Sequence, residues 1–94
     1  MVFLKKENKI AIVACIEMAL MRRGNENYNL VRSKLKNLYN CEFSDCMDNL
    51  EYLRTVLKDV YGQDYDSVLQ DITWEFETLD MDEFKTEFCE IMSS

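Results

Sequence analysis

The first helix that the sequence predicts, over residues 10–23, is apolar on nearly every side, and Glu17 is its one charged residue before Arg22. A helix that is hydrophobic all round is usually covered by its neighbours, so we expect this helix to lie centrally. Arg22 and Arg23 suit its C-terminal end, where cations meet the negative pole of the helix dipole. Gly24 follows and predicts a left-handed cap.

Four more segments carry apolar residues at spacings of three and four, which place them on one face of an α-helix. These segments are residues 26–40, 48–61, 64–79 and 81–91. Asp48, Asp64 and Asp80 stand before or at the start of three of them and predict N-caps. Asp48 and Asp80 are each followed three residues later by glutamate, as in a capping box. Gly62 is expected to end its helix in the left-handed conformation.

Over residues 40–48, between the predicted helices 26–40 and 48–61, the helical periodicity lapses. Cys41, Phe43 and Cys46 supply this turn with apolar anchors. Ser44 is a good helix initiator and predicts a short first turn there.

Residues that interrupt helices are scarce, since the 94 residues contain no proline and two glycines. Strand-rich proteins need many such residues for their turns, so this scarcity favours helix throughout. A chain of this length has material for one hydrophobic core. We therefore predict an all-α protein, a compact bundle of about five short helices that forms one domain over residues 1–94.

The middle of the chain resembles a known family. An aromatic residue, a cysteine turn with Ser44-Asp45-Cys46, the segment 51–62 ending in Tyr-Gly, and Tyr65 follow in the order seen in the small helical Nitrosopumilus-type output domains of archaeal proteins. The resemblance extends from about Tyr28 to Leu79. It implies an all-helical output or interaction module of signalling and regulatory proteins, with no catalytic residues to carry over.

The four cysteines bear on the compartment. Cys15 and Cys89 lie in apolar helical patterns, where a free cysteine behaves as a small hydrophobe. Reduced thiols predict a cytoplasmic protein. For Cys41 and Cys46 a disulfide or a share in a zinc site stays open as an alternative. No secretory leader and no membrane-spanning segment are expected, because the N-terminal apolar run is too short and lacks a cleavage site.

The chain lacks residues that several kinds of catalytic and ligand-binding site require. The chain has no histidine, which excludes serine–histidine and cysteine–histidine catalysis. Its two glycines lie too far apart for a phosphate-binding loop. The acidic run at residues 80–83 lacks the glycine and glutamate positions of an EF-hand. We therefore predict a protein that is not an enzyme, without catalytic, cofactor-binding or metal-binding residues.

Charge is divided unevenly along the chain. Residues 1–40 hold eight basic and three acidic residues, a net +5, whereas residues 41–94 hold three basic and fifteen acidic residues, a net −12, which together give −7. Three interpretations stay open: the halves pack together in one monomer, they pair between copies, or the basic half binds an anionic partner. For the last, the candidate anion-binding residues are Arg32, Lys34 and Lys36.

These observations favour a small non-catalytic interaction module with a regulatory role, whose partner is a protein and possibly a second copy. Surplus apolar surface often marks an interface, and the candidates are Phe3, Phe84, Phe88 and Ile91. The alternative is a nucleic-acid-associated regulator that uses the basic N-terminal helices. The net charge of −7 disfavours it, because an acidic protein repels polyanions.

Overall fold

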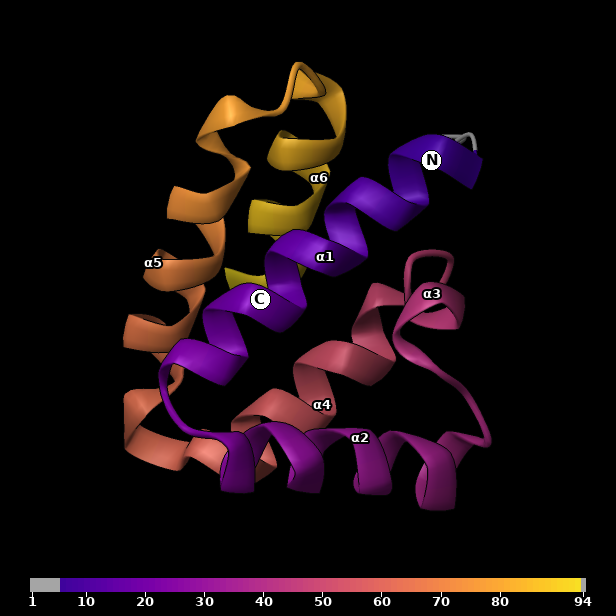
Figure 1. Ribbon diagram of the computed structural model, residues 1–94, viewed down its shortest axis with the longest axis vertical. Coiled ribbons are helices and arrows are strands. Elements are labelled where there is room, and N and C mark those ends of the chain that lie inside the picture. The colour runs from indigo at the N-terminus through magenta and orange to yellow at the C-terminus, as the bar shows by residue number, and fades with distance from the viewer. Residues whose placement is uncertain (1–5, 94) are drawn as a thin grey trace.

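A computed structural model describes residues 6–93, and the chain between these limits is helical with no strand (Figure 1). The helices are α1 Lys6–Arg22, α2 Asn25–Tyr39, α3 Phe43–Cys46, α4 Leu50–Tyr61, α5 Tyr65–Glu75 and α6 Asp82–Ser93. Two short 3-10 helices, Gly62–Asp64 and Phe76–Thr78, join α4 to α5 and extend α5. Five helices of 11 to 17 residues and the single turn α3 confirm the predicted all-α class.

Helix α1 holds the two halves of the bundle together. It crosses diagonally over the middle of the view in Figure 1, while α2 runs along the bottom and α5 stands at the left. On one side α1 contacts α5, and on the other it contacts α2 and α3. Helix α4 packs against α2, α5 and α6, so the described part of the chain closes into a body of 30 × 26 × 24 Å.

The core draws on all the longer helices. Its largest fully buried side chains are Phe76, Phe88, Ile12, Ile16, Leu20, Leu35, Leu53, Leu57, Ile72, Met92, Val31 and Val56. Among the described residues no charged side chain is buried. The predicted anchors of the cysteine turn, Cys41, Phe43 and Cys46, are buried as well, which confirms their role.

The burial of the C-terminal helix α6 contradicts the predicted interface at Phe84 and Phe88. Phe84 and Phe88 are 2% and 0% exposed, and their rings pack with Phe76 at centroid distances of 5.8 and 5.1 Å. The expectation that they form an accessible interface is therefore wrong, because α6 turns its only apolar face inward. Ile91 is half-buried beside this core, and Phe3 lies outside the described residues.

The ends of the helices differ from the predicted caps. Gly24 (φ 131°) precedes α2, and Gly62 (φ 53°, ψ −116°) has a positive φ but lies outside the left-handed helical region. Asn40 (φ 52°, ψ 43°) takes that conformation instead and ends α2. Its N–H donates to the Lys36 carbonyl, which is the bond of an αL motif, and the N–H of Cys41 donates to the Leu35 carbonyl.

Asp64 occupies the predicted N-cap position of α5, whereas the predicted N-caps at Asp48 and Asp80 are misplaced. Helix α4 begins after Asn49 rather than after Asp48, and α6 begins at Asp82, two residues beyond Asp80. No side-chain cap bond is made by Asn49 or by Asp64. These shifts of one or two residues follow from packing, which sets where each helix can start once its apolar face is buried.

The conformation of Asn40 yields a testable expectation. Replacing Asn40 with alanine should lower the free energy of unfolding by about 1 kcal/mol, because a Cβ without a polar side chain disfavours the left-handed region. Replacement with glycine should leave it unchanged or raise it slightly. Urea unfolding followed by circular dichroism measures both, and equal losses in the two variants would contradict this assignment.

Candidate functional site

The outer side of α1 is apolar, and none of the other described residues covers it. Ile10, Ala14, Met18 and Met21 follow one another at spacings of four, four and three, so they share one side of the helix. All four are exposed, and Ile10 is 61% exposed. We call this set of four residues the outer face of α1.

The opposite side of the same helix is part of the core. Ile12, Ile16, Ala19 and Leu20 are at most 1% exposed, in contact with the rest of the bundle. A helix that is apolar on both sides has two surfaces to bury, and the described residues bury only one of them. The prediction that α1 is central holds for its inner side and is wrong for its outer side, because α5, α2 and α3 flank the helix without crossing over it.

Two hollows border the outer face. One, of about 430 Å³, lies near the N-terminal end of α1 and is lined by Ile10, Val13 and Ala14 with Ser44 of α3 at its edge. A smaller one, of about 150 Å³, lies between α1 and α5, where Trp74 is largely exposed and the Arg22 guanidinium lies 5.9 Å from its ring centroid. Apolar surface thus continues the outer face at Val13 and near Trp74, but Lys6, Lys9 and Glu17 also line the first hollow, and Arg22, Asp71 and Glu75 line the second.

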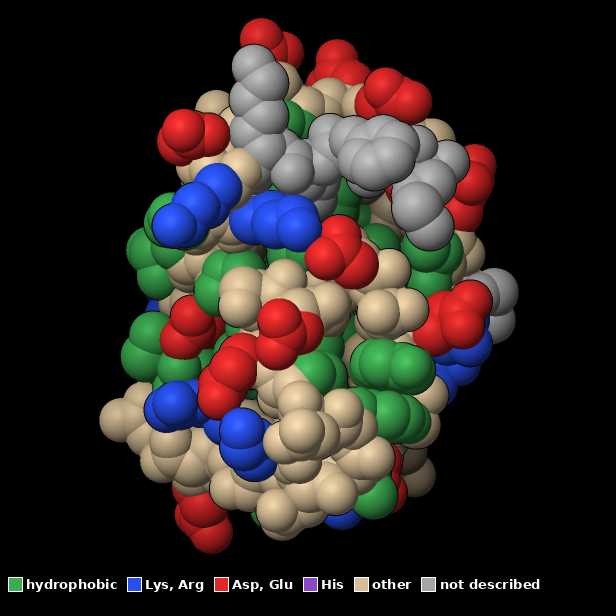
Figure 2. All heavy atoms as spheres, turned by 90° about the vertical axis from the view of Figure 1, so that its right-hand side faces the viewer, with side chains coloured by type: hydrophobic (Ala, Val, Ile, Leu, Met, Phe, Trp, Pro, Cys, Tyr) green, Lys and Arg blue, Asp and Glu red, His purple; other side chains and the backbone are tan. Residues whose placement is uncertain are grey.

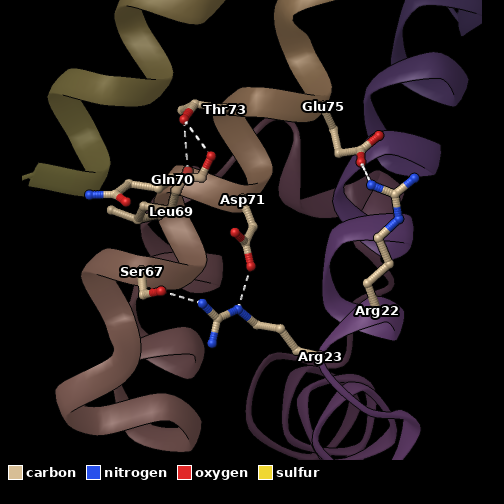
Figure 3. A network of polar contacts seen from close by, with 8 residues as sticks. All are labelled: Arg22, Arg23, Ser67, Leu69, Gln70, Asp71, Thr73 and Glu75. Atoms are coloured by element: carbon tan, nitrogen blue, oxygen red, sulfur yellow. Dashed lines mark hydrogen bonds and ion pairs between the residues drawn. The ribbon is translucent and has the colours of Figure 1, made fainter.

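Ion pairs fix α1 against α5 (Figure 3). Arg22 bonds Glu75, and Arg23 bonds both Asp71 and Ser67. Near them the Cys15 thiol donates to the Glu75 carbonyl oxygen at 3.6 Å. These polar contacts lie at the edge of the α1–α5 packing, so they orient α1 and leave its outer face open.

The uneven charge distribution is explained by such pairs. Four ion pairs each join a basic residue of positions 1–40 to an acidic residue of positions 41–94: Lys9–Asp48, Arg22–Glu75, Arg23–Asp71 and Lys34–Asp59. Basic residues of the first half therefore pack beside acidic residues of the second half within one monomer, which supports the first of the three interpretations. On the face drawn in Figure 2, outside the grey atoms, basic and acidic side chains are interspersed.

The three candidate anion-binding residues do not form one cluster. Lys34 points toward α4 and pairs with Asp59, whereas Arg32 and Lys36 line an open hollow of about 460 Å³ on another side of α2. The Arg32 guanidinium lies 5.7 Å from the Tyr28 ring centroid. Glu42 also lines this hollow, so its positive charge is partly offset.

Residues 6–93 contain neither a cluster of metal-binding side chains nor a membrane-spanning helix. All four cysteines are free thiols, and no group of three or more side chains that bind metals gathers there. None of the described helices has the length and hydrophobicity needed to cross a bilayer. Cys41 and Cys46 are nevertheless in contact, with their Sγ atoms 3.5 Å apart.

The sequence pattern of α1 is compatible with an exposed apolar face as well as with a covered helix. The all-round hydrophobicity of residues 10–23 indicated a covered helix, although a helix with two apolar sides equally fits one that keeps a side for a partner. In comparisons with protein families, curated proteins and solved structures, none matches this chain. Function is therefore argued from the surface itself.

Proposed function

We propose that this protein is a small non-catalytic interaction module that self-associates through the outer face of α1. The observation that carries the proposal is the uncovered apolar stripe from Ile10 to Met21 on a helix whose other side is in the core. Soluble proteins tend to cover contiguous apolar surface with a partner. Charged residues border this face, and several are paired within the chain: Glu17 accepts a bond from the Tyr28 hydroxyl, Lys9 pairs with Asp48, and Arg22 and Arg23 pair with Glu75 and Asp71.

A second copy fits this face because the stripe is nearly symmetric. Ile10 precedes Ala14 by four residues, and Met18 follows it by four. A two-fold axis through Ala14 would make the helices antiparallel and set Ile10 of one copy beside Met18 of the other, as an isologous interface requires. The small side chain of Ala14 at the centre would let the two helices approach closely.

The size of the face sets the expected affinity. Helix α1 has 17 residues and is therefore about 25 Å long and about 10 Å across. An interface of this area falls below the size of stable complexes, which bury about 1,200 Å² or more in total. We therefore expect a dimer in rapid exchange with monomer, with a dissociation constant on the order of 10–100 µM.

Substitution of the face tests the proposal. Sedimentation or size-exclusion with light scattering over roughly 10–500 µM should show a monomer–dimer equilibrium for the natural chain. The double variant Ile10→Lys with Met18→Lys should remain monomeric over that range, because two charges would be desolvated in the interface. Added salt should strengthen the natural dimer, since each copy carries a net −7 charge and screening reduces their repulsion.

Leu38→Lys is the matched control. Leu38 and Ile10 are both 61% exposed, but Leu38 lies on α2. This variant should dimerise like the natural chain, and both variants should retain its unfolding free energy within about 0.5 kcal/mol. A monomer at every concentration, or equal loss of dimer in the two variants, would refute self-association through α1.

The proposal includes a regulatory, non-catalytic role in the cytoplasm. A regulatory module in the cytoplasm accords with the four free thiols and with the resemblance of Tyr28 to Leu79 to archaeal output domains. A non-catalytic role accords with a chain that has no histidine. A nucleic-acid role is supported less, because Lys34 is paired and Arg32 and Lys36 share their hollow with Glu42.

A further inference from the structure

Cys41 and Cys46 are two buried thiols that lie outside the proposed interaction surface. Cys41 follows the left-handed Asn40 that ends α2, and Cys46 ends the single turn of α3. Their exposed fractions are 7% and 0%, and their Sγ atoms lie 3.5 Å apart. We propose that this pair is a site of reversible oxidation, at which a small-molecule disulfide of the glutathione type converts the two thiols to an intramolecular disulfide.

Local structure holds the two thiols in contact. The N–H of Cys41 donates to the Leu35 carbonyl, which ties Cys41 to the end of α2. On the other side, the Asp45 carboxylate accepts a bond of 2.9 Å from the N–H of Glu42 and fixes the start of α3. Between them Phe43 is buried and stacks on Tyr28 at a centroid distance of 6.0 Å. The segment is thus anchored at three points, which keep the two thiols in contact.

Burial favours the oxidised product over the thiolates. Burial, followed by the bond with Cys41, raises the pKa of Cys46, because a charged sulfur is poorly solvated there. A disulfide is uncharged and has no donor to satisfy, so the apolar surroundings that oppose a thiolate do not oppose the bond. The buried environment therefore slows thiol–disulfide exchange by Cys46 but is compatible with the uncharged Cys41–Cys46 disulfide.

The reaction proceeds by two exchanges. The thiolate of Cys41, the more exposed of the two, attacks one sulfur of the small disulfide RSSR, forms a Cys41–SR mixed disulfide and releases RSH after protonation. Cys46 then loses its proton to solvent and attacks the Cys41 sulfur, which breaks the Cys41–SR bond and releases a second RSH. Two protein thiols are oxidised, and one small disulfide is reduced to two thiols.

Trypsin isolates the pair from the other cysteines. Cleavage after Lys36 and Arg54 gives the peptide 37–54, which contains Cys41 and Cys46 and no other cysteine. Cys15 and Cys89 fall in peptides 10–22 and 86–94 and serve as internal controls. The full chain is equilibrated with mixtures of oxidised and reduced glutathione, quenched in acid, alkylated with N-ethylmaleimide under denaturing conditions, digested and analysed by mass spectrometry.

In the folded protein, peptide 37–54 should lose both maleimide groups together and appear two hydrogens lighter than its reduced form. Exposed Cys89 should instead carry single glutathione adducts. The equilibrium constant for closing the Cys41–Cys46 bond should be at least about tenfold higher in the folded protein than in concentrated guanidinium chloride. In a Cys15→Ala/Cys89→Ser background, oxidation should raise Tm by roughly 5–15 °C.

The proposal fails if Cys41 and Cys46 both stay alkylated while Cys89 is modified, or if the denatured chain closes the bond as readily as the folded one. A mixed disulfide that accumulates on Cys41 without closing would also overturn it. These readouts concern bonds within one chain, so they do not depend on whether the protein dimerises through α1.

Discussion

Replacement of Phe88 by alanine is expected to lower the free energy of unfolding by about 3–5 kcal/mol, the range for removing a buried phenylalanine side chain. Phe88 is 0% exposed, and its ring centroid lies 5.1 Å from that of Phe76 and 5.9 Å from that of Phe84. A domain is typically stable by roughly 5–15 kcal/mol, so this loss should be a large fraction of the total stability. Urea unfolding measures the loss.

Ile91→Ala on the same helix is the matched comparison. Ile91 is half-buried, so we expect a loss of about 1 kcal/mol. Since Phe88 faces the core, its effect on dimerisation should follow only from unfolding. A folded Phe88→Ala protein of natural stability that no longer dimerises would restore Phe88 as an interface residue and contradict its burial.

Alkaline solution is expected to unfold the protein between about pH 10 and about pH 12. Burial raises the pKa of Tyr65 from its ordinary 10 to about 12, and burial raises the pKa of Tyr28 and Tyr61 as well. The folded state then holds these phenolic protons more tightly than the unfolded state does. Their contribution to stability is complete below pH 10 and is lost as the pH rises through the folded pKa.

Two phenylalanine variants separate the contributions to this alkaline transition. The Tyr65 hydroxyl donates to the Met92 carbonyl oxygen at 2.7 Å, so Tyr65→Phe should cost about 1 kcal/mol at neutral pH and make the transition shallower. The Tyr61 hydroxyl is buried and has no partner among the described residues, so Tyr61→Phe should cost nothing at neutral pH. Tyrosinate absorbance and far-ultraviolet circular dichroism follow both events. Ionisation of all five tyrosines near pH 10 with helicity intact would contradict the prediction.

The helices were predictable because each leaves a local signal. The apolar spacing in 26–40, 48–61 and 81–91 reappears as α2, α4 and α6 to within a few residues. The caps were less predictable, since several acidic residues can occupy the start of a helix and packing decides among them. Asn40, which shares the left-handed conformation with glycine only at some cost, was missed for the same reason.

The site was harder to predict because hydrophobicity alone does not say which surfaces stay uncovered. The pattern of Phe84 and Phe88 gives α6 a single apolar side, and a small domain needs that side for its core. Helix α1, by contrast, has a second apolar side, with Ile10 and Met18, that the core does not bury. The proposed interface therefore lies on the least amphipathic of the longer helices, and the contact between Cys41 and Cys46 could be seen only in the coordinates.

The pairing of α1 with α5 also determines the order in which the chain can fold during synthesis. Arg23 bonds Ser67 and Asp71, 44 and 48 residues further along, and Cys15 bonds Glu75, 60 residues further. At about 5–20 residues per second, the ribosome makes these partners roughly 2–12 s after α1. During that interval the inner side of α1 lacks its native cover from α5, so we expect both apolar sides of the nascent helix to face solvent until α5 has been made.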